Sequence, residues 1–96
     1  MAGNDGKIKA SHILVDKHSR ALEIAQMIIN KQKTFEQAAA EFSSCPSKKK
    51  GGDLGSFARG QMVREFDEAA RKLQVGQMTT EPVKTQFGYH LIKRTG

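Results

Sequence analysis

Apolar and polar residues alternate along the first regular stretch of the chain. Residues 7–15 read KIKASHILV, and this run of β-branched and apolar side chains predicts a β-strand. The alternation divides its side chains between two faces, with Ile8, Ala10, His12 and Leu14 on one face and Ile13 and Val15 on the other. Apolar residues on both faces indicate an inner strand that helices cover on one side.

Two helices are predicted next, because apolar residues recur at helical spacing. Ser19 is the expected N-cap of a helix that continues to about Lys31. Thr34 and Gln37 have the spacing of a capping box, which predicts a second helix through about Phe42. The expected buried positions are Ala21, Leu22, Ile24, Ala25, Ile28 and Ile29 in the first helix and Phe35, Ala38, Ala39 and Phe42 in the second.

The second half of the chain predicts a glycine-rich strand, a helix and a hairpin. The three glycines of residues 51–57 (GGDLGSF) indicate close backbone approach or positive φ. A helix is expected over 64–73, with a stop at Val75 and Gly76. Strands over 78–84 and 89–93 would be joined as a hairpin through residues 85–88. This order is typical of an α+β fold around an antiparallel sheet.

Length and charge bound the class of protein. The 96 residues fit one domain, which we expect over 7–96 after a disordered lead-in of residues 1–6. No run of 18 apolar residues is present, and the first residues lack the apolar stretch of a signal peptide, so we expect a cytoplasmic protein. The single cysteine, Cys45, excludes an intramolecular disulfide. The formal charge of +6 favours acidic partners, and a monomer is expected.

Two histidines in apolar strands are the first candidates for chemistry. Burying the ring of His12 or His90 without a partner would cost about 1–3 kcal/mol. Each ring therefore either bonds to backbone in the core, or the two rings satisfy each other or line a pocket. Cys45 is either a small apolar side chain or a thiol that faces both histidines. A Cys-His hydrolase would lack an orienting carboxylate, and a zinc site of these three residues would lack paired ligand spacing.

Four segments together resemble the parvulin family of prolyl isomerases. They are residues 10–15 (ASHILV), 43–55 (SSCPSKKKGGDLG), 57–62 (FARGQM) with Phe66, and 87–92 (FGYHLI). The resemblance covers nearly the whole chain, and the order and spacing of the segments make it specific. It implies a four-stranded antiparallel sheet surrounded by helices and rotation of X-Pro bonds in exposed or unfolded polypeptide segments. No cofactor or metal is expected.

The resemblance also implies the residues of the site. His12 and His90 would be the paired histidines of the pocket floor, with the Thr85 hydroxyl bonded into the pair. Cys45 matches a position where parvulins carry Cys or Asp, and we expect it to act by polarity without a covalent step. The apolar walls that receive the proline ring would be Leu54, Met62 and Phe66, and the rim would be Gln61 and Phe87. On residue type alone, Met62 and Phe66 also fit plain core packing.

Two departures from the family pattern bear on specificity and on the sheet. Members that demand a phosphorylated residue before proline carry a long arginine-rich loop after the first strand, whereas here residues 16–18 (DKH) make a short connection that begins with an acid. Strict phosphate dependence is therefore not expected. Residues 76–82 are one residue longer than the usual pattern, which predicts a bulge in the third strand.

Two functions other than catalysis stay open at this point. One is a chaperone that holds proline-containing segments without isomerising them. The other is weak contact with anions, nucleic acid or a membrane surface through Lys48, Lys49 and Lys50, with Arg59 and Arg64 adding to the positive field. No aromatic residues alternate with these basic ones, so sequence-specific nucleic-acid recognition is not expected.

Overall fold

A four-stranded antiparallel sheet forms the centre of the protein. The computed structural model describes residues 6–96, so residues 1–5 of the expected disordered lead-in lie outside the described residues. The strands lie in the order β2-β1-β4-β3, where β1 is Ile8–Val15, β2 Asp53–Phe57, β3 Val83–Thr85 and β4 Gly88–Arg94. The expected fold class is confirmed, and β1 is the inner strand that its two apolar faces indicate.

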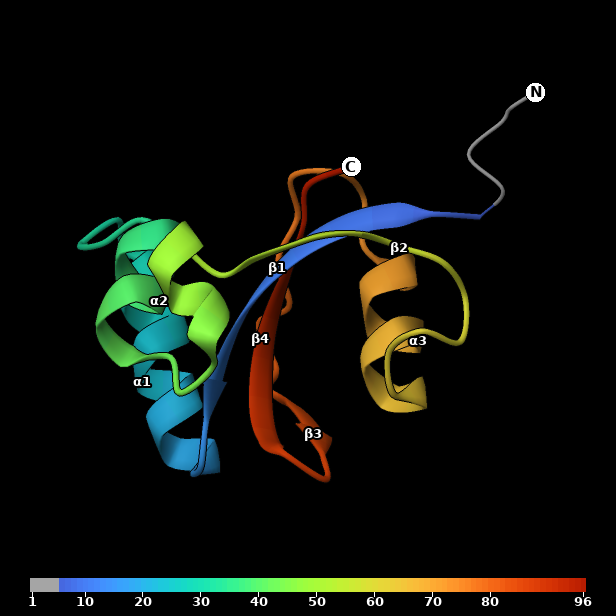
Figure 1. Ribbon diagram of the computed structural model, residues 1–96. Coiled ribbons are helices and arrows are strands. Elements are labelled where there is room, and N and C mark those ends of the chain that lie inside the picture. The colour runs from blue at the N-terminus through green and yellow to red at the C-terminus, as the bar shows by residue number, and fades with distance from the viewer. Residues whose placement is uncertain (1–5) are drawn as a thin grey trace.

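Helices cover both faces of this sheet. α1 (His18–Ile29) and α2 (Phe35–Phe42) lie on one side, and α3 (Arg64–Lys72) lies on the other (Figure 1). The alternation along β1 explains this arrangement, because Ile13 and Val15 pack with α1 and α2 while Ile8 and Ala10 pack with α3. The cover on one side that β1 alone indicated is incomplete, and the sheet surrounded by helices that the family resemblance implies is confirmed. Among residues 6–96, no helix is long and apolar enough to cross a bilayer.

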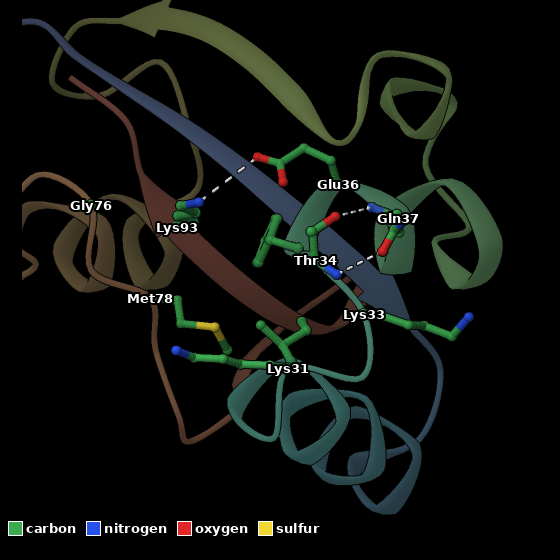
Figure 2. A pocket seen from close by; sticks show the side chains of 10 residues that line it. Lys31, Lys33, Thr34, Glu36, Gln37, Gly76, Met78 and Lys93 are labelled. Atoms are coloured by element: carbon green, nitrogen blue, oxygen red, sulfur yellow. Dashed lines mark hydrogen bonds and ion pairs between the residues drawn. The ribbon is translucent and has the colours of Figure 1, made fainter.

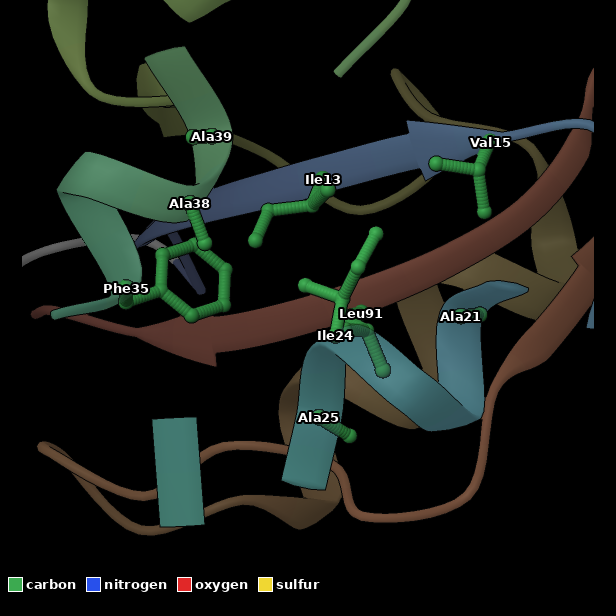
Figure 3. Close-up of a cluster of buried hydrophobic side chains, with 9 residues drawn as sticks. All are labelled: Ile13, Val15, Ala21, Ile24, Ala25, Phe35, Ala38, Ala39 and Leu91. Carbon is green, nitrogen blue, oxygen red and sulfur yellow. The ribbon is translucent and has the colours of Figure 1, made fainter. Parts of the chain in front are cut away.

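The first two helices bury a narrow stripe of small and branched side chains. Figure 3 shows Ile24 and Phe35 pointing toward Ile13 and Leu91 of the sheet. Leu22 and Ile29, which were expected in the stripe, are 40% and 49% exposed. The buried residues of α1 are Ala21, Ile24 and Ala25, so its contact with the sheet is narrower than the predicted stripe.

The ends of α1 and α2 differ in how well the sequence predicts them. α1 begins at His18 with Lys17 as its N-cap, so the prediction of Ser19 was wrong. The Lys17 carbonyl accepts the N–H of Ala21, and this bond closes the first turn before Ser19 is reached. α2 has the predicted capping box, in which Thr34 accepts from the Gln37 N–H and Gln37 accepts from the Thr34 N–H.

The third strand is shorter than predicted, and the segment before it pairs irregularly with β4. α3 ends at Lys72, before the predicted stop, and only Val83–Thr85 is regular strand afterwards. Val83 pairs with His90, while Met78 pairs with Lys93, so a step of five residues on one strand faces a step of three on the other. Residues 79–82 thus hold two more residues than the facing part of β4, and they lie outside regular strand, so the expected one-residue bulge within the third strand is not what forms.

Gly52 carries the close backbone approach that the glycine-rich segment indicates. Its φ is +87°, and an added Cβ would lie 2.4 Å from the His12 carbonyl oxygen. The Gly52 carbonyl accepts the His12 N–H at 2.9 Å. This bond ties the backbone of β1 to the segment that enters β2. A side chain at position 52 would push away the part of β1 that presents His12.

Candidate active site

A pocket of about 510 Å³ lies on the α3 side of the sheet. Eight of the nine predicted site residues line it, and the ninth, Thr85, lies directly behind His90. The structure thus brings together residues from all four strands, from α3 and from three connecting segments. The lining also includes four residues that the sequence did not single out, namely Leu14, Ser44, Pro46 and Val63. Leu14 follows His12 by two residues on one face of a strand, so the alternation contained that signal.

The two histidines satisfy each other at the pocket floor. Leu14 lies opposite His90 in the β1–β4 pairing, so His12 and His90 are diagonal neighbours on one face. Their Nδ1 atoms are 2.9 Å apart, and their rings stack with centroids 5.1 Å apart. Both are buried. The sequence left open whether each ring bonds to backbone or to the other ring. In the structure the two rings bond to each other, and both line the pocket.

The hydrogen bonds around Thr85 determine how protons are placed in the pair. The Thr85 Oγ1 accepts the Phe87 N–H at 3.1 Å and lies 2.7 Å from His90 Nε2. We assign the hydroxyl proton to a bond donated to His90 Nε2, because this gives the Thr85 proton an acceptor. His90 Nδ1–H then donates to His12 Nδ1. The chain of donors ends at His12 Nε2–H, which is buried without a partner among residues 6–96.

Replacing Thr85 by valine should weaken this chain while keeping the side-chain shape. We expect kcat/KM on an X-Pro peptide to fall about fivefold, because the orientation of the His90 ring loses a hydrogen bond worth roughly 1 kcal/mol. Thr79→Val is the matched control, since the Thr79 hydroxyl also accepts a backbone N–H, that of Ile92, but Thr79 does not line the pocket. Equal losses of turnover in the two variants would contradict a role for Thr85 in the site.

Burial keeps both histidines neutral near physiological pH. The pKa of each imidazole is lowered to about 4, by burial for both rings and, to a smaller extent for His12, by the neighbouring His90. Histidines in an unfolded chain titrate near pH 6.5. Between about pH 6.5 and 4 the unfolded state therefore binds more protons than the folded state, and the free energy of unfolding falls as the pH falls through this window.

The lowered pKa of the two histidines predicts how turnover and stability each depend on pH. Turnover should vary little between pH 6 and 8, because neither ring gains a proton there. Urea unfolding at intervals from pH 7 to 4 should show stability falling, by up to about 1.4 kcal/mol per pH unit for each histidine. An inflection of kcat/KM near pH 6.5, in protein that remains folded, would instead assign a protonation step to the pair.

Cys45 is held at the pocket by the segment that precedes it. The Ser43 hydroxyl accepts the N–H groups of Leu14 at 3.0 Å and Cys45 at 3.3 Å, and the Leu14 carbonyl accepts the Ser44 N–H. These bonds attach the start of the 3₁₀ helix η1 (Pro46–Lys50) to the end of β1. Ser43 was missed from the sequence, because nothing in residues 43–46 distinguishes a buried serine from an exposed one.

The apolar wall of the pocket is built around one aromatic ring. Phe66 is 2% exposed and meets the rings of His12 and His90 edge-on, with centroids 5.6 Å and 5.4 Å away. Met62 and Leu54 pack beside it and are only partly buried, so they present surface to the pocket. Phe87 is 61% exposed at the rim. Phe66 and Met62 therefore serve both the core and the pocket.

Metal chemistry has no support in this arrangement. Across residues 6–96, no three His, Cys, Asp or Glu side chains come together in a way that could hold a metal ion. The alternative of a zinc site built from Cys45, His12 and His90 is therefore not formed. What remains is a largely apolar pocket with one thiol, a neutral histidine pair and a buried ring donor in its walls.

Comparison with known proteins identifies relatives over almost the whole chain. Residues 9–96 match the family model described as the rotamase, PPIC-type PPIASE domain. The chain is 50% identical over 94 residues to the foldase protein PrsA of Bacillus subtilis, covering 97% of this chain and 32% of PrsA. It therefore spans about a third of the length of the curated relatives it matches.

Solved structures add a small protein of similar length to this comparison. NmPin, the parvulin of Nitrosopumilus maritimus, is 49% identical with a TM-score of 0.83, and the match covers 98% of this chain and 100% of NmPin. PrsA from Bacillus anthracis is 46% identical with a TM-score of 0.88, over 96% of this chain and 42% of that one. The fold and the sequence thus have the same relatives.

Proposed function

The chain belongs to the PPIC-type, or parvulin, family of peptidyl-prolyl cis/trans isomerase domains, and we propose that it accelerates X-Pro rotation in exposed or unfolded polypeptide segments by a non-covalent mechanism. The observation that carries this proposal is the pocket, in which an apolar wall faces a buried and neutral histidine pair. Such a pocket can seat a proline ring and exclude water from the bond that precedes it.

Rotation of an X-Pro bond needs no bond to break. The barrier is roughly 18–20 kcal/mol and uncatalysed exchange takes tens to hundreds of seconds. The planar amide carries resonance charge on its oxygen, and the twisted amide has lost it. A dry pocket without formal charge therefore stabilises the twisted state relative to the planar one. An acceleration of about 10⁵-fold would need about 7 kcal/mol of such differential stabilisation.

Each group of the pocket has a part in this mechanism. Leu54, Met62 and Phe66 hold the proline ring while the preceding carbonyl turns. The Cys45 sulfur faces the turning carbonyl, and its lone pairs disfavour the planar form, whose oxygen is the more negative. The histidine pair, kept neutral by burial and oriented by Thr85, supports the pocket floor without transferring a proton.

We propose that a phosphate before the proline is not required. Only Asp16 and Lys17 separate β1 from α1, so no arginine-rich loop lies over this end of the sheet. Turnover on peptides with Glu-Pro, Arg-Pro, Leu-Pro and phosphoserine-Pro tests both parts of the proposal. We expect acceleration of all four. Acceleration of the phosphoserine peptide alone would contradict phosphate independence, and binding without acceleration would favour the chaperone alternative.

Four further features stay proposals. The partners are proline-containing segments, and weak contact with anions, nucleic acid or a membrane surface would run through Lys48, Lys49 and Lys50, which are exposed on η1. Gel shift and liposome pelleting across a salt series test such contact, which should fade as salt rises. The monomeric state and the cytoplasmic location remain predictions from the sequence.

A further inference from the structure

A second pocket of about 480 Å³ lies on the opposite side of the sheet from the histidine pair, where the α1–α2 turn approaches β4. Figure 2 shows the first turn of α2 on one side, with Thr34, Glu36 and Gln37, and the side chains of Lys31, Lys93 and Met78 on the other. Ile28, Phe35 and Met78 supply apolar surface. We call this site the lysine pocket. It shares no residue with the active-site pocket.

Lys31 occupies this pocket at a cost in backbone strain. Its φ is +63°, and within residues 6–96 it is the only non-glycine residue with positive φ. It follows the C-cap Asn30 of α1, a position where glycine or asparagine is usual. A cation near the end of a helix is favourable, but an ordinary position in the last turn of α1 would provide that without left-handed backbone. Strained backbone at a single residue is typical of positions where the side chain has a function.

The lysines of the pocket differ in how well their charges are compensated. Lys33 pairs with Glu41, and its ammonium points away from the pocket (Figure 2). Lys93 lies 3.8 Å from Glu36, a long contact between partly exposed groups. Among residues 6–96, Lys31 makes no ion pair. The pocket therefore offers one free and one loosely paired ammonium beside an apolar floor.

From this arrangement we propose that the lysine pocket binds an acidic side chain of a polypeptide, with an apolar neighbour of that residue on the floor. Lys31 and Lys93 would contact the carboxylate, and Ile28 and Met78 would receive the apolar group. The choice of a polypeptide rests on the proposed function, since an isomerase domain acts on polypeptides. The site would hold an acidic segment of a client on the face away from the catalytic pocket.

Charge and shape favour a peptide over other anionic partners. A nucleic-acid backbone or a membrane surface presents many negative charges and is best met by a broad cationic face. The lysine pocket is concave, is partly apolar, and includes the carboxylate of Glu36, which would repel a dense array of phosphates. A single carboxylate on an apolar stem suits two ammonium groups beside a methionine and an isoleucine.

Binding can be measured without any proline in the probe. We suggest titrating the full chain with a blocked Leu-Glu-Leu-Glu peptide and with its Leu-Gln-Leu-Gln counterpart, and following amide shifts by NMR at low salt. Shifts should gather at Lys31, Gly76, Met78 and Lys93, and the neutral peptide should bind at least about fivefold more weakly. Lys31→Gln should weaken the acidic peptide about three- to fivefold. Lys72→Gln, which removes an exposed charge on α3, is the matched control and should change nothing.

A glycine variant separates the strain from the binding. Lys31→Gly should raise the Tm by about 2–6 °C, because glycine accepts left-handed backbone, and should weaken peptide binding as Lys31→Gln does. Equal affinity for the acidic and neutral peptides, or shifts that gather around Lys48 in place of Lys31, would overturn the proposal. The proposal would also be overturned if phosphate or anionic vesicles shifted the amides of the lysine pocket and the acidic peptide did not. Because no arm measures turnover, an inactive domain that binds the acidic peptide would sink the proposed function and leave this inference standing.

Discussion

Phe66→Leu should lower kcat/KM on X-Pro peptides about thirtyfold. Leucine keeps the position apolar but removes the ring that forms the pocket wall and meets both imidazoles edge-on. The lost contact with the proline ring and the looser packing of the histidine pair together amount to about 2 kcal/mol of transition-state stabilisation. Protease-coupled or NMR exchange assays would measure the effect. Because Phe66 is also 2% exposed in the core, a loss of stability of about 1–2 kcal/mol accompanies it.

Phe57→Leu is the control that separates the pocket from the core. Phe57 is equally buried, belongs to the same hydrophobic cluster and packs against Phe66 with ring centroids 6.0 Å apart. It does not line the pocket. The two variants should lose similar stability in urea, while only Phe66→Leu loses turnover. Parallel losses of turnover in both would mean that Phe66 acts through the fold alone and that the ring is not a wall for substrate.

The sequence predicted the inner strand β1 and the face of its histidine through alternation along residues 7–15. Residues two apart on a strand face the same way, and this placed His12 beside Leu14 on one face; that α3 covers this face is seen only in the structure. The family resemblance supplied what periodicity could not, namely the partnership of residues from segments far apart in the sequence. Gly52 was predictable as a close approach, but that its Cβ would meet the His12 carbonyl depends on tertiary packing.

The features that were missed depend on contacts between segments distant in sequence. Leu22 was expected to be buried on α1 because it is apolar, but the sheet contact is narrow and leaves it 40% exposed. Ser43 looks like any loop serine, and only its bonds to Leu14 and Cys45 identify it as a buried support. The left-handed backbone of Lys31 contradicts local preference, so no rule based on propensity would predict it.

Cys45→Ala should lower kcat/KM about 30–100-fold, whereas Cys45→Asp should stay within about tenfold of the native protein. Alanine removes the polar atom that faces the turning carbonyl and thereby loses about 2–3 kcal/mol of differential stabilisation. Aspartate places negative charge at the same position, where it likewise disfavours the planar amide. The exchange needs little rearrangement, because Cys45 is half-buried and its backbone is held by Ser43.

Ser44→Asp is a control that tests whether the introduced carboxylate must lie at position 45. Ser44 also lines the pocket but is exposed, so Ser44→Asp adds the same charge one residue away. We expect Ser44→Asp to leave turnover unchanged and to give no rescue when combined with Cys45→Ala, because the charge no longer faces the carbonyl. A nucleophilic thiol would give a different pattern, since aspartate would not replace its attack on the amide in this pocket. Cys45→Asp protein that is folded but as slow as Cys45→Ala would therefore overturn the non-covalent mechanism.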